Sequence, residues 1–243
     1  MNQSCRVSRA MYSVLSYIIM QTLLSTGRAV RTDMLVVCYQ GSGDGGQLGD
    51  GSEMHRLVPQ HIGGRAEFAG ARIVVVSAGE EHSAAQADDG SVYTWGTGTH
   101  GCLGSSPQLT PRRVPNLPAV RMVACGDAHT LALTDREVWA WGMGAEGQLG
   151  QGHRQNCVEP ARIVVPDADD QPVFVAAGAR HSLAVTAQGS VLSWGAGGCG
   201  RLGLHDEEDR LLPTALAHSD LSEVLQVLAL AARAGVCEYA RFL

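Results

Sequence analysis

Aromatic residues and charged residues are scarce in this chain of 243 residues, and neither sign of charge is in large excess. Only 5% of the residues are aromatic and 17% are charged. Lysine and arginine total 18 against 24 aspartate and glutamate, a formal net charge of −6, so no broad cationic surface for nucleic acid is expected. Because 45% of the residues are hydrophobic, the composition still predicts a folded chain.

Closely spaced cysteine pairs are also absent from the sequence. Its seven cysteines are scattered and include no Cys-x-x-Cys, so neither a zinc ribbon nor a dithiol redox motif is present. An odd number of cysteines without paired spacing is typical of a protein in a reducing compartment. The sequence therefore predicts an intracellular protein, in the cytoplasm or the nucleus.

The chain has no hydrophobic run long enough for a confident membrane segment. The longest candidate, Met11 to Leu24, is shorter than the roughly 20 apolar residues of a membrane helix. It could be the apolar part of a signal peptide, but Ser25-Thr26-Gly27 is a poor cleavage site. We expect residues 1–35 to be a non-repeat N-terminal segment and do not expect secretion.

Glycine, in contrast, is abundant, at 30 of 243 residues against roughly 7% in average proteins. Many of the glycines belong to a segment that recurs four times, a strand-like run ending in Trp-Gly and followed by Gly-x-x-Gly-x-Leu-Gly. The first copy has Gln40 in place of the tryptophan. The four copies occupy residues 37–49, 92–104, 138–150 and 191–203.

A second segment, Gly-x-x-His-Ser/Thr, precedes each of the last three copies and begins at Gly79, Gly126 and Gly178. A β-rich run leads into it, and a turn separates it from the strand that ends in Trp-Gly. Short strands punctuated by turns predict one antiparallel sheet per repeat, with each Gly-x-x-His segment and each segment ending in Trp-Gly at strand positions of successive blades. With about 50 residues per repeat, the predicted fold is all-β, an incomplete β-propeller of about three blades and part of a fourth.

These linked segments closely resemble the repeats of the regulator of chromosome condensation family. Repeats of that family carry Gly-x-x-His-Ser/Thr, then a strand ending in Trp-Gly, then Gly-x-x-Gly-Gln-Leu-Gly. The similarity runs from Val37 to Ala217, within a repeat region that we place at residues 36–218. The resemblance implies a propeller, and complete propellers of the family have more blades than this chain supplies.

Each copy also contains Gly-x-Gly-x-x-Gly, which in isolation would suggest a phosphate-binding loop. A phosphate loop needs a following helix whose N-terminus faces the phosphates, whereas here Leu-Gly and a connection rich in proline follow. We assign these glycines to tight bends that require positive φ angles.

The one histidine of each repeated segment could act as a metal ligand or a general base. Its recurrence in every unit favours a structural role, in which a buried imidazole and a neighbouring hydroxyl meet where adjacent blades pack. The tryptophans are assigned to blade packing. No catalytic residue, metal ligand or cofactor is predicted, and the structural repeat residues are Gly79, His82, Trp95, Gly96, Gly126, His129, Trp141, Gly142, Gly178, His181, Trp194 and Gly195.

Positions that vary inside these constant segments are not needed to build the blade, so we expect their side chains to face solvent. Loop residues on a rigid scaffold commonly bind partners, although drift at unconstrained positions is the alternative for each of them. The candidates for partner binding are Glu80, Glu81, Asp127, Arg180, Asp44, His100 and Glu146.

The repeat pattern breaks down after Pro213, where no Gly-x-x-His follows. Asp220 and Glu223 could cap a helix, and alanine and leucine favour one from Leu221 to Arg233. We therefore predict a C-terminal helix or divergent end in residues 219–243, and a truncated or misjoined coding sequence would look the same.

Two functions follow from these observations. The first is a non-catalytic scaffold for protein–protein interaction, which the resemblance implies broadly. The alternative, also implied by the resemblance, is guanine-nucleotide exchange on a small GTPase of the Ran type. The chain shows no insertion that could act as a wedge against a GTPase, and its negative charge disfavours contact with chromatin. Open blade edges would also permit self-association.

Overall fold

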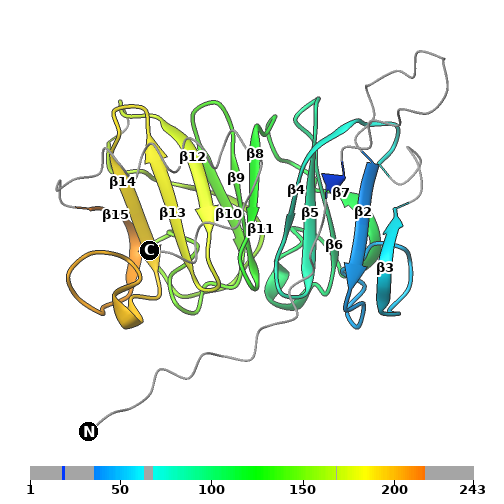
Figure 1. Cartoon of the computed structure of the whole chain (residues 1–243). Coiled ribbons are helices and arrows are strands. Elements are labelled where there is room, and N and C mark those ends of the chain that lie inside the picture. The colour runs from blue at the N-terminus through cyan, green and yellow to red at the C-terminus, as the bar shows by residue number, and fades with distance from the viewer. Residues whose placement is uncertain (1–17, 20–35, 63–67, 168, 217–243) are drawn as a thin grey trace, which may run out of the picture.

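The computed structural model describes residues 18–19, 36–62, 68–167 and 169–216 as four antiparallel sheets standing side by side (Figure 1). We number these sheets as blades 1 to 4 in chain order. Blade 1 has three described strands, β1 (Ile18–Ile19), β2 (Val36–Gly41) and β3 (Arg56–His61).

Each of the other three blades is a four-stranded meander. Blade 2 contains β4 (Ile73–Ala78), β5 (His82–Ala87), β6 (Val92–Gly96) and β7 (Gln108–Arg113). Blade 3 contains β8 (Met122–Cys125), β9 (His129–Leu133), β10 (Val138–Gly142) and β11 (Cys157–Ile163). Blade 4 contains β12 (Pro172–Ala177), β13 (His181–Thr186), β14 (Val191–Gly195) and β15 (Arg210–Ala215).

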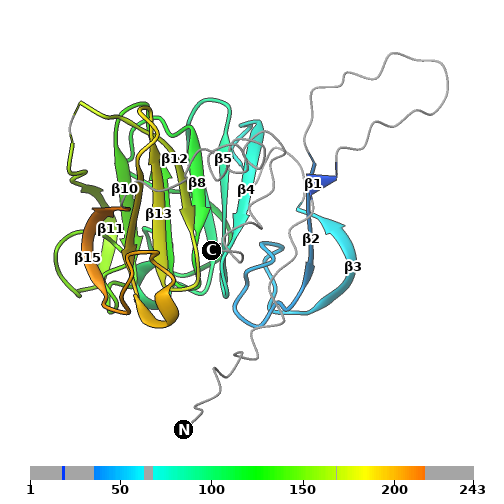
Figure 2. The same ribbon diagram turned by 60° about the vertical axis from the view of Figure 1, so that its left-hand side comes forward.

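The blades form an arc, and in blades 2 to 4 the first strands are neighbours. β4 packs against β8, and β8 packs against β12. Blade 1 and blade 4 lie at opposite ends of this arc, as the two views of the chain show (Figures 1 and 2). Among the described residues no strand of blade 1 packs extensively against a strand of blade 4, so the arrangement is the incomplete propeller that the sequence predicts.

The position of the two repeated segments within the sheets partly differs from expectation. Each segment ending in Trp-Gly is a strand, β6, β10 or β14, as predicted. The Gly-x-x-His segments, also expected at strand positions, are instead turns whose histidine alone begins a strand. His82, His129 and His181 each pair with the glycine that ends the next strand.

The bends after Trp-Gly contain the only helical elements in the described part of the chain. These are two 3₁₀ turns of three residues, Thr99–Gly101 and Gly198–Gly200. No helix follows any of the bends within the described residues, which removes the structural basis of a phosphate loop. The third glycine of each bend has a positive φ, from 68° to 83°, as the bend interpretation requires.

The hydrophobic core lies mainly between blades, because the tryptophan of each blade packs against the blade before it. Trp95 of blade 2 shares a buried cluster with Leu48 of blade 1, and Trp194 of blade 4 shares one with Leu149 of blade 3. The indole Nε1 groups of Trp95 and Trp194 each donate to a backbone carbonyl of the preceding blade, at 2.9 Å. Burial of the aromatic surface therefore holds successive blades together.

Candidate interaction surface

The seven candidate partner-binding residues lie along one edge of the arc. In each full blade the second strand begins where the third strand ends, because the two are antiparallel. This register brings the Gly-x-x-His turn and the bend after Trp-Gly to the same end of the blade, which is the lower edge in Figure 1. We call this edge the rim, and it carries Asp44, Glu80, Glu81, His100, Asp127, Glu146 and Arg180.

Contacts between neighbouring blades link two of the candidates directly. The guanidinium of Arg180 in blade 4 lies 3.5 Å from a carboxylate oxygen of Glu146 in blade 3. Arg154 lies 3.9 Å from the same carboxylate and 2.9 Å from that of Asp209. The rim is therefore a charged network that crosses the boundary between blades 3 and 4.

Arg154 and Asp209 were missed by the sequence analysis, because they lie in the loop after the bend, where the repeats differ in length. A weak sequence signal does exist for Asp209. In three blades, the residue 12 positions after the second glycine of the bend accepts a hydrogen bond from that glycine. The backbone N–H of Gly197 donates to Asp209, that of Gly144 to Asn156, and that of Gly43 to His55. The hydrogen bond from Gly197 is the main cause that lowers the pKa of Asp209.

The other candidates present mainly acidic groups. Glu80 and Glu81 are exposed in the turn before β5. Asp127 is half-buried, and its pKa is raised first by burial and then by the charge of Glu80, with Arg180 acting in the opposite sense. Asp44 lies 3.4 Å from the ring nitrogen of His55. The rim thus holds five carboxylates among its seven candidates, which favours a partner of positive charge.

Two of the repeated histidines bridge adjacent blades, and the hydroxyl that each contacts belongs to the next blade. Nε2 of His82 lies 2.9 Å from Oγ1 of Thr130, and Nε2 of His129 lies 3.0 Å from Oγ of Ser182. Both hydroxyls donate their proton to a backbone carbonyl, that of Cys102 or Gln148. Each hydroxyl must therefore accept from the imidazole, which assigns the proton to Nε2.

Burial keeps these imidazoles neutral. It lowers the pKa of His82 to about 4, against a smaller opposing effect of the Asp127 backbone. The pKa of His129 falls to about 3, first through burial and then through His82 and His181. Burial also lowers the pKa of His181 to about 4. A neutral, buried imidazole that is hydrogen-bonded to a hydroxyl, as in His82 and His129, is typical of a structural group, and the structural role of the repeated histidines stays a prediction.

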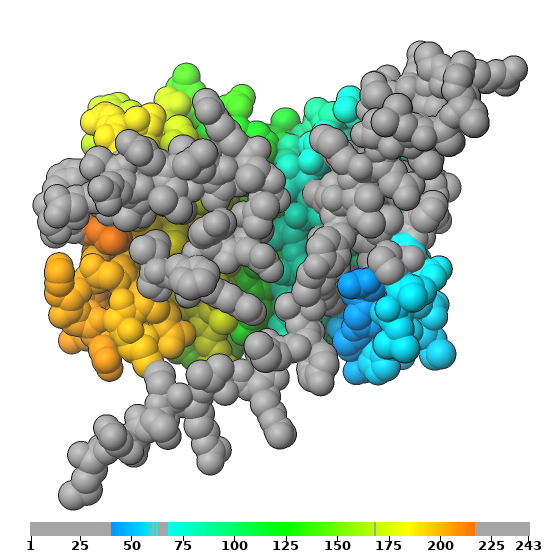
Figure 3. Space-filling view, viewed as in Figure 1, coloured from blue at the N-terminus to red at the C-terminus, as the bar shows by residue number. Residues whose placement is uncertain are grey.

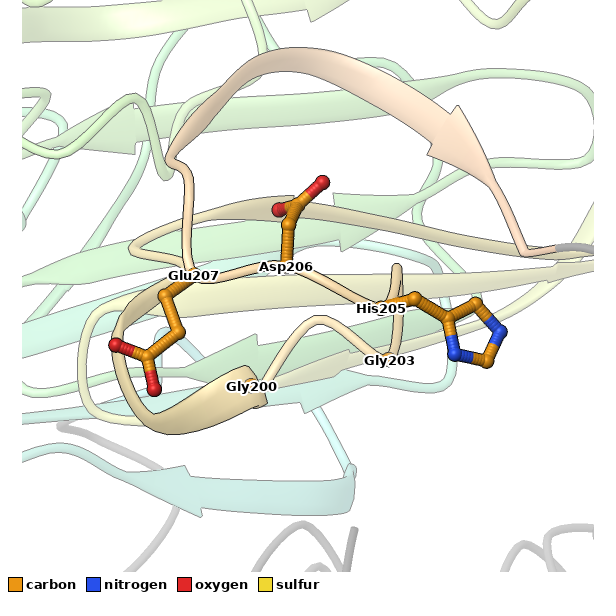
Figure 4. Close-up of a pocket in the computed structure, with 5 residues that line it drawn as sticks. All are labelled: Gly200, Gly203, His205, Asp206 and Glu207. Atoms are coloured by element: carbon orange, nitrogen blue, oxygen red, sulfur yellow. The ribbon is translucent and has the colours of Figure 1, made fainter.

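A hollow of about 400 Å³ in the described surface is lined by Gly200, Gly203, His205, Asp206 and Glu207. Figure 4 shows that the three side chains on its edge point in different directions and share no common focus.

Within the described residues no group of three or more His, Cys, Asp and Glu side chains is placed to hold a metal ion. None of the described residues forms a helix long and apolar enough to span a membrane.

The sequence matches the family described as regulator of chromosome condensation (RCC1) repeat over four segments, residues 37–86, 89–133, 135–185 and 188–229. The chain belongs to this family. A second RCC1 repeat family matches residues 73–102, 120–148 and 173–201. The last of the four RCC1 matches reaches into residues 219–243, which lie outside the described residues, so the helix expected there stays a prediction.

Relatives of this RCC1-repeat chain include receptors and ligases. It is 40% identical over 185 residues to the ultraviolet-B receptor UVR8 of Arabidopsis thaliana, covering 73% of this chain and 41% of that protein. It is 37% identical over 209 residues to the E3 ubiquitin-protein ligase HERC2 of Homo sapiens, covering 81% of this chain and 4% of that protein. The chain therefore spans less than half the length of these relatives.

Solved structures agree on the fold. Human WBSCR16 superposes with a TM-score of 0.68 at 25% identity, covering 76% of this chain and 49% of that one. Yeast RCC1 (Prp20), solved in a complex with Kap60, superposes with a TM-score of 0.66 at 24% identity, covering 76% and 46%. RCC1-repeat membership supports a role in protein interaction or regulation.

Proposed function

We propose that this RCC1-repeat chain is a non-catalytic scaffold that binds a protein partner through its rim. The observation that carries the proposal is the convergence of the varying residues of separate repeats on one edge, with Arg180 and Glu146 in contact across two blades. Residues that build the blade are the same in each repeat, whereas the rim residues differ and therefore give each blade its own surface chemistry.

The partner that fits this surface is a protein with a basic patch. Carboxylates of blades 1, 2 and 3 supply most of the charge on the rim, and opposite charges across an interface increase the association rate and select the partner. Binding should weaken as salt is added, because exposed charges are screened over about 8 Å at physiological ionic strength.

Site-specific photo-crosslinking tests the proposal in cells that express the full chain. A photoreactive amino acid at Glu80 lies on the rim, whereas the same amino acid at Asp88 lies at the opposite end of the same strand, β5. Both positions are exposed turn residues next to β5, so they are matched controls. We expect a discrete crosslinked partner from position 80 only. Equal crosslinking from both positions, or none from position 80, would contradict a binding rim.

A second candidate function is nucleotide exchange on a Ran-type small GTPase. It is favoured by a structural neighbour, Prp20p of Saccharomyces cerevisiae, which has been characterised for its binding to Gsp1p and histones. That structure is 20% identical to this chain, a level at which only the fold carries over. Release of a fluorescent guanine nucleotide from a Ran-type GTPase separates the two functions. We expect no acceleration by this chain, and a tenfold or greater acceleration, about 1.4 kcal/mol of barrier, would establish exchange in place of scaffolding.

A further inference from the structure

The two ends of the arc carry complementary halves of the contact that joins one blade to the next. At the inner boundaries the contact is made by a bend of one blade and the outer strand of the following blade. The third glycine of the bend receives an aliphatic side chain, so that Gly46 faces Leu109, Gly101 faces Val158 and Gly147 faces Leu211. This pairing occurs at three successive boundaries.

At the C-terminal end of the arc, no described residue fills the receiving half. Gly200 of blade 4 is equivalent to Gly46, Gly101 and Gly147 and has the same positive φ, 68°. Those three glycines are buried, whereas Gly200 is exposed, and a Cβ built on it meets no described atom within 4 Å. The carbonyl of the next residue, Arg201, likewise receives no described donor, although the equivalent Gln47 carbonyl accepts from Ser83 and Trp95.

His181 at the same end lacks a hydroxyl of the kind that its counterparts bind. His82 and His129 each reach a hydroxyl of the following blade, but none of the described residues makes a hydrogen bond with the imidazole of His181. The receiving half at blade 4 therefore consists of a glycine bend, a carbonyl and an imidazole. We call it the tail face, defined by His181, Gly200 and Arg201.

At the N-terminal end of the arc, no described residue covers the inserting half. Leu57 on β3 is equivalent to Leu109, Val158 and Leu211, and it is 94% exposed. The exposed fractions of Leu109 and Val158, which pack on the preceding bend, are 37% and 57%. Figure 3 shows blade 1 and blade 4 at opposite ends of the molecule, so Leu57 does not fill the tail face of its own chain.

The polar groups that flank the two halves can pair as well. At the boundary of blades 3 and 4, Arg154 of the leading blade contacts Asp209 of the following blade. Counted from the glycines of the bend, the equivalent residue beside the tail face is Glu207 and the equivalent residue in blade 1 is His55. Because Nδ1 of His55 accepts from Gly43, its Nε2–H is the donor, and it would meet the Glu207 carboxylate as acceptor.

We propose that a second copy of this chain docks head to tail, with its Leu57 seated on the Gly200 bend. Such a contact joins two different surfaces, and repetition of it gives a closed ring or a filament. The proposal concerns the end faces of the arc and does not rest on binding at the rim. A second copy is the occupant that the observations favour, because the chain itself carries both halves.

Complementation between two variants of the full chain tests this contact. Leu57→Asp places a charge on the inserting half, and Gly200→Asp places one on the receiving half, at a φ that aspartate tolerates better than most residues. Val58→Asp is the matched control, because the next position along the strand is exposed in every blade and polar in two of them, as Thr110 and Glu159.

We expect the wild-type chain and Val58→Asp to associate in sedimentation equilibrium, and each single end variant to associate at least about tenfold more weakly. An equimolar mixture of Leu57→Asp and Gly200→Asp should form a dimer, because each variant keeps one intact half. The double variant Glu207→Arg, His55→Asp should associate more strongly than Glu207→Arg alone.

Three results would overturn the proposal. The first is a wild-type chain that stays monomeric over the whole concentration range, and the second is association that survives both Leu57→Asp and Gly200→Asp. The third is capture of the tail face only by a separately expressed RCC1 repeat from another chain, since this would assign the surface to a different occupant. Circular dichroism of each variant verifies that the chain remains folded.

Discussion

The histidine of each repeat is the residue whose role the structure defines most closely. In His82 and His129 the imidazole sits at the boundary between blades and donates to a hydroxyl that belongs to the next blade. These two repeated residues are thus links between repeats. The arrangement also leaves the buried Nδ1 atom of each imidazole without a hydrogen-bond partner among the described residues, which lowers the stability of the fold.

Removal of one such link should destabilise the fold. His129→Ala leaves the Ser182 hydroxyl without its donor, and we expect the free energy of unfolding to fall by about 1 to 3 kcal/mol. Urea denaturation followed by tryptophan fluorescence measures this change. His153→Ala, at an exposed histidine, is the control and should leave the unfolding midpoint in place. An unchanged midpoint for His129→Ala would show that the link contributes nothing.

Acidification should destabilise the protein through the same residues. The pKa of His82 is lowered to about 4 and that of His129 to about 3. Since the unfolded histidines take up protons near pH 6.5, stability is fully present above that pH and is lost below it, until the folded forms are protonated too. We expect each buried histidine to contribute a slope of about 1.4 kcal/mol per pH unit between about pH 6 and pH 4.

Urea midpoints measured at several pH values between 7.5 and 4.5 check this dependence. His129→Gln removes one titrating group and should give a shallower slope than the wild-type chain, whereas His153→Gln should not. A slope that His129→Gln leaves unchanged would place the pH sensitivity elsewhere.

At the scale of the structural element, the bend after Trp-Gly is the piece that makes blades stack. Its third glycine has a positive φ and at the same time leaves room for the aliphatic side chain of the next blade. The glycine pattern that resembles a phosphate loop is therefore explained by packing between blades rather than by a ligand.

Two alanine substitutions separate the packing of the bend from its conformation. Gly147→Ala and Gly200→Ala both place a Cβ at a positive φ, 82° and 68°, so they share a backbone cost of about 1 to 2 kcal/mol. Only Gly147→Ala also pushes a Cβ to 2.6 Å from Leu211. We expect it to reduce the free energy of unfolding by about 1 to 3 kcal/mol more than Gly200→Ala does. The comparison is made by urea denaturation at a protein concentration at which the chain is monomeric, so that no second copy packs on Gly200. Equal losses under that condition would contradict the packing role of the bend.

At the scale of the whole molecule, the described residues form an arc with a blade face and sheet edges open at each end. Radially repeated sheets need about four to eight blades to close around an axis, and open edges pair readily with other chains. The described residues supply three complete blades and one three-stranded sheet.

The purified chain should therefore self-associate or aggregate, with or without its C-terminal segment. Light scattering on the full chain and on a chain that lacks residues 219–243 checks this prediction. The segment is the one for which the sequence predicts a helix, and its removal should not convert the protein into a compact monomer. A cooperatively folded monomer after that deletion would contradict the importance of the open edges.

The sequence alone determined the repeat, the all-β class and the place of the strands that end in Trp-Gly. These properties are local, because the same short segment folds in the same way in each repeat. The burial of Trp95, Trp141 and Trp194 was predictable for the same reason, since an invariant aromatic residue in a strand needs a core. Only the turn geometry of Gly-x-x-His was misjudged, because a turn and the start of a strand share that segment.

Tertiary structure alone decided how the repeats meet. The first RCC1 repeat match, residues 37–86, spans β2 to β5 and thus parts of two sheets, which no sequence period reveals. Contacts such as Arg180 with Glu146, or His82 with Thr130, join residues of different repeats. The sequence displays what the repeats have in common, whereas these contacts depend on the stagger between adjacent sheets, which is set by the packing of whole blades.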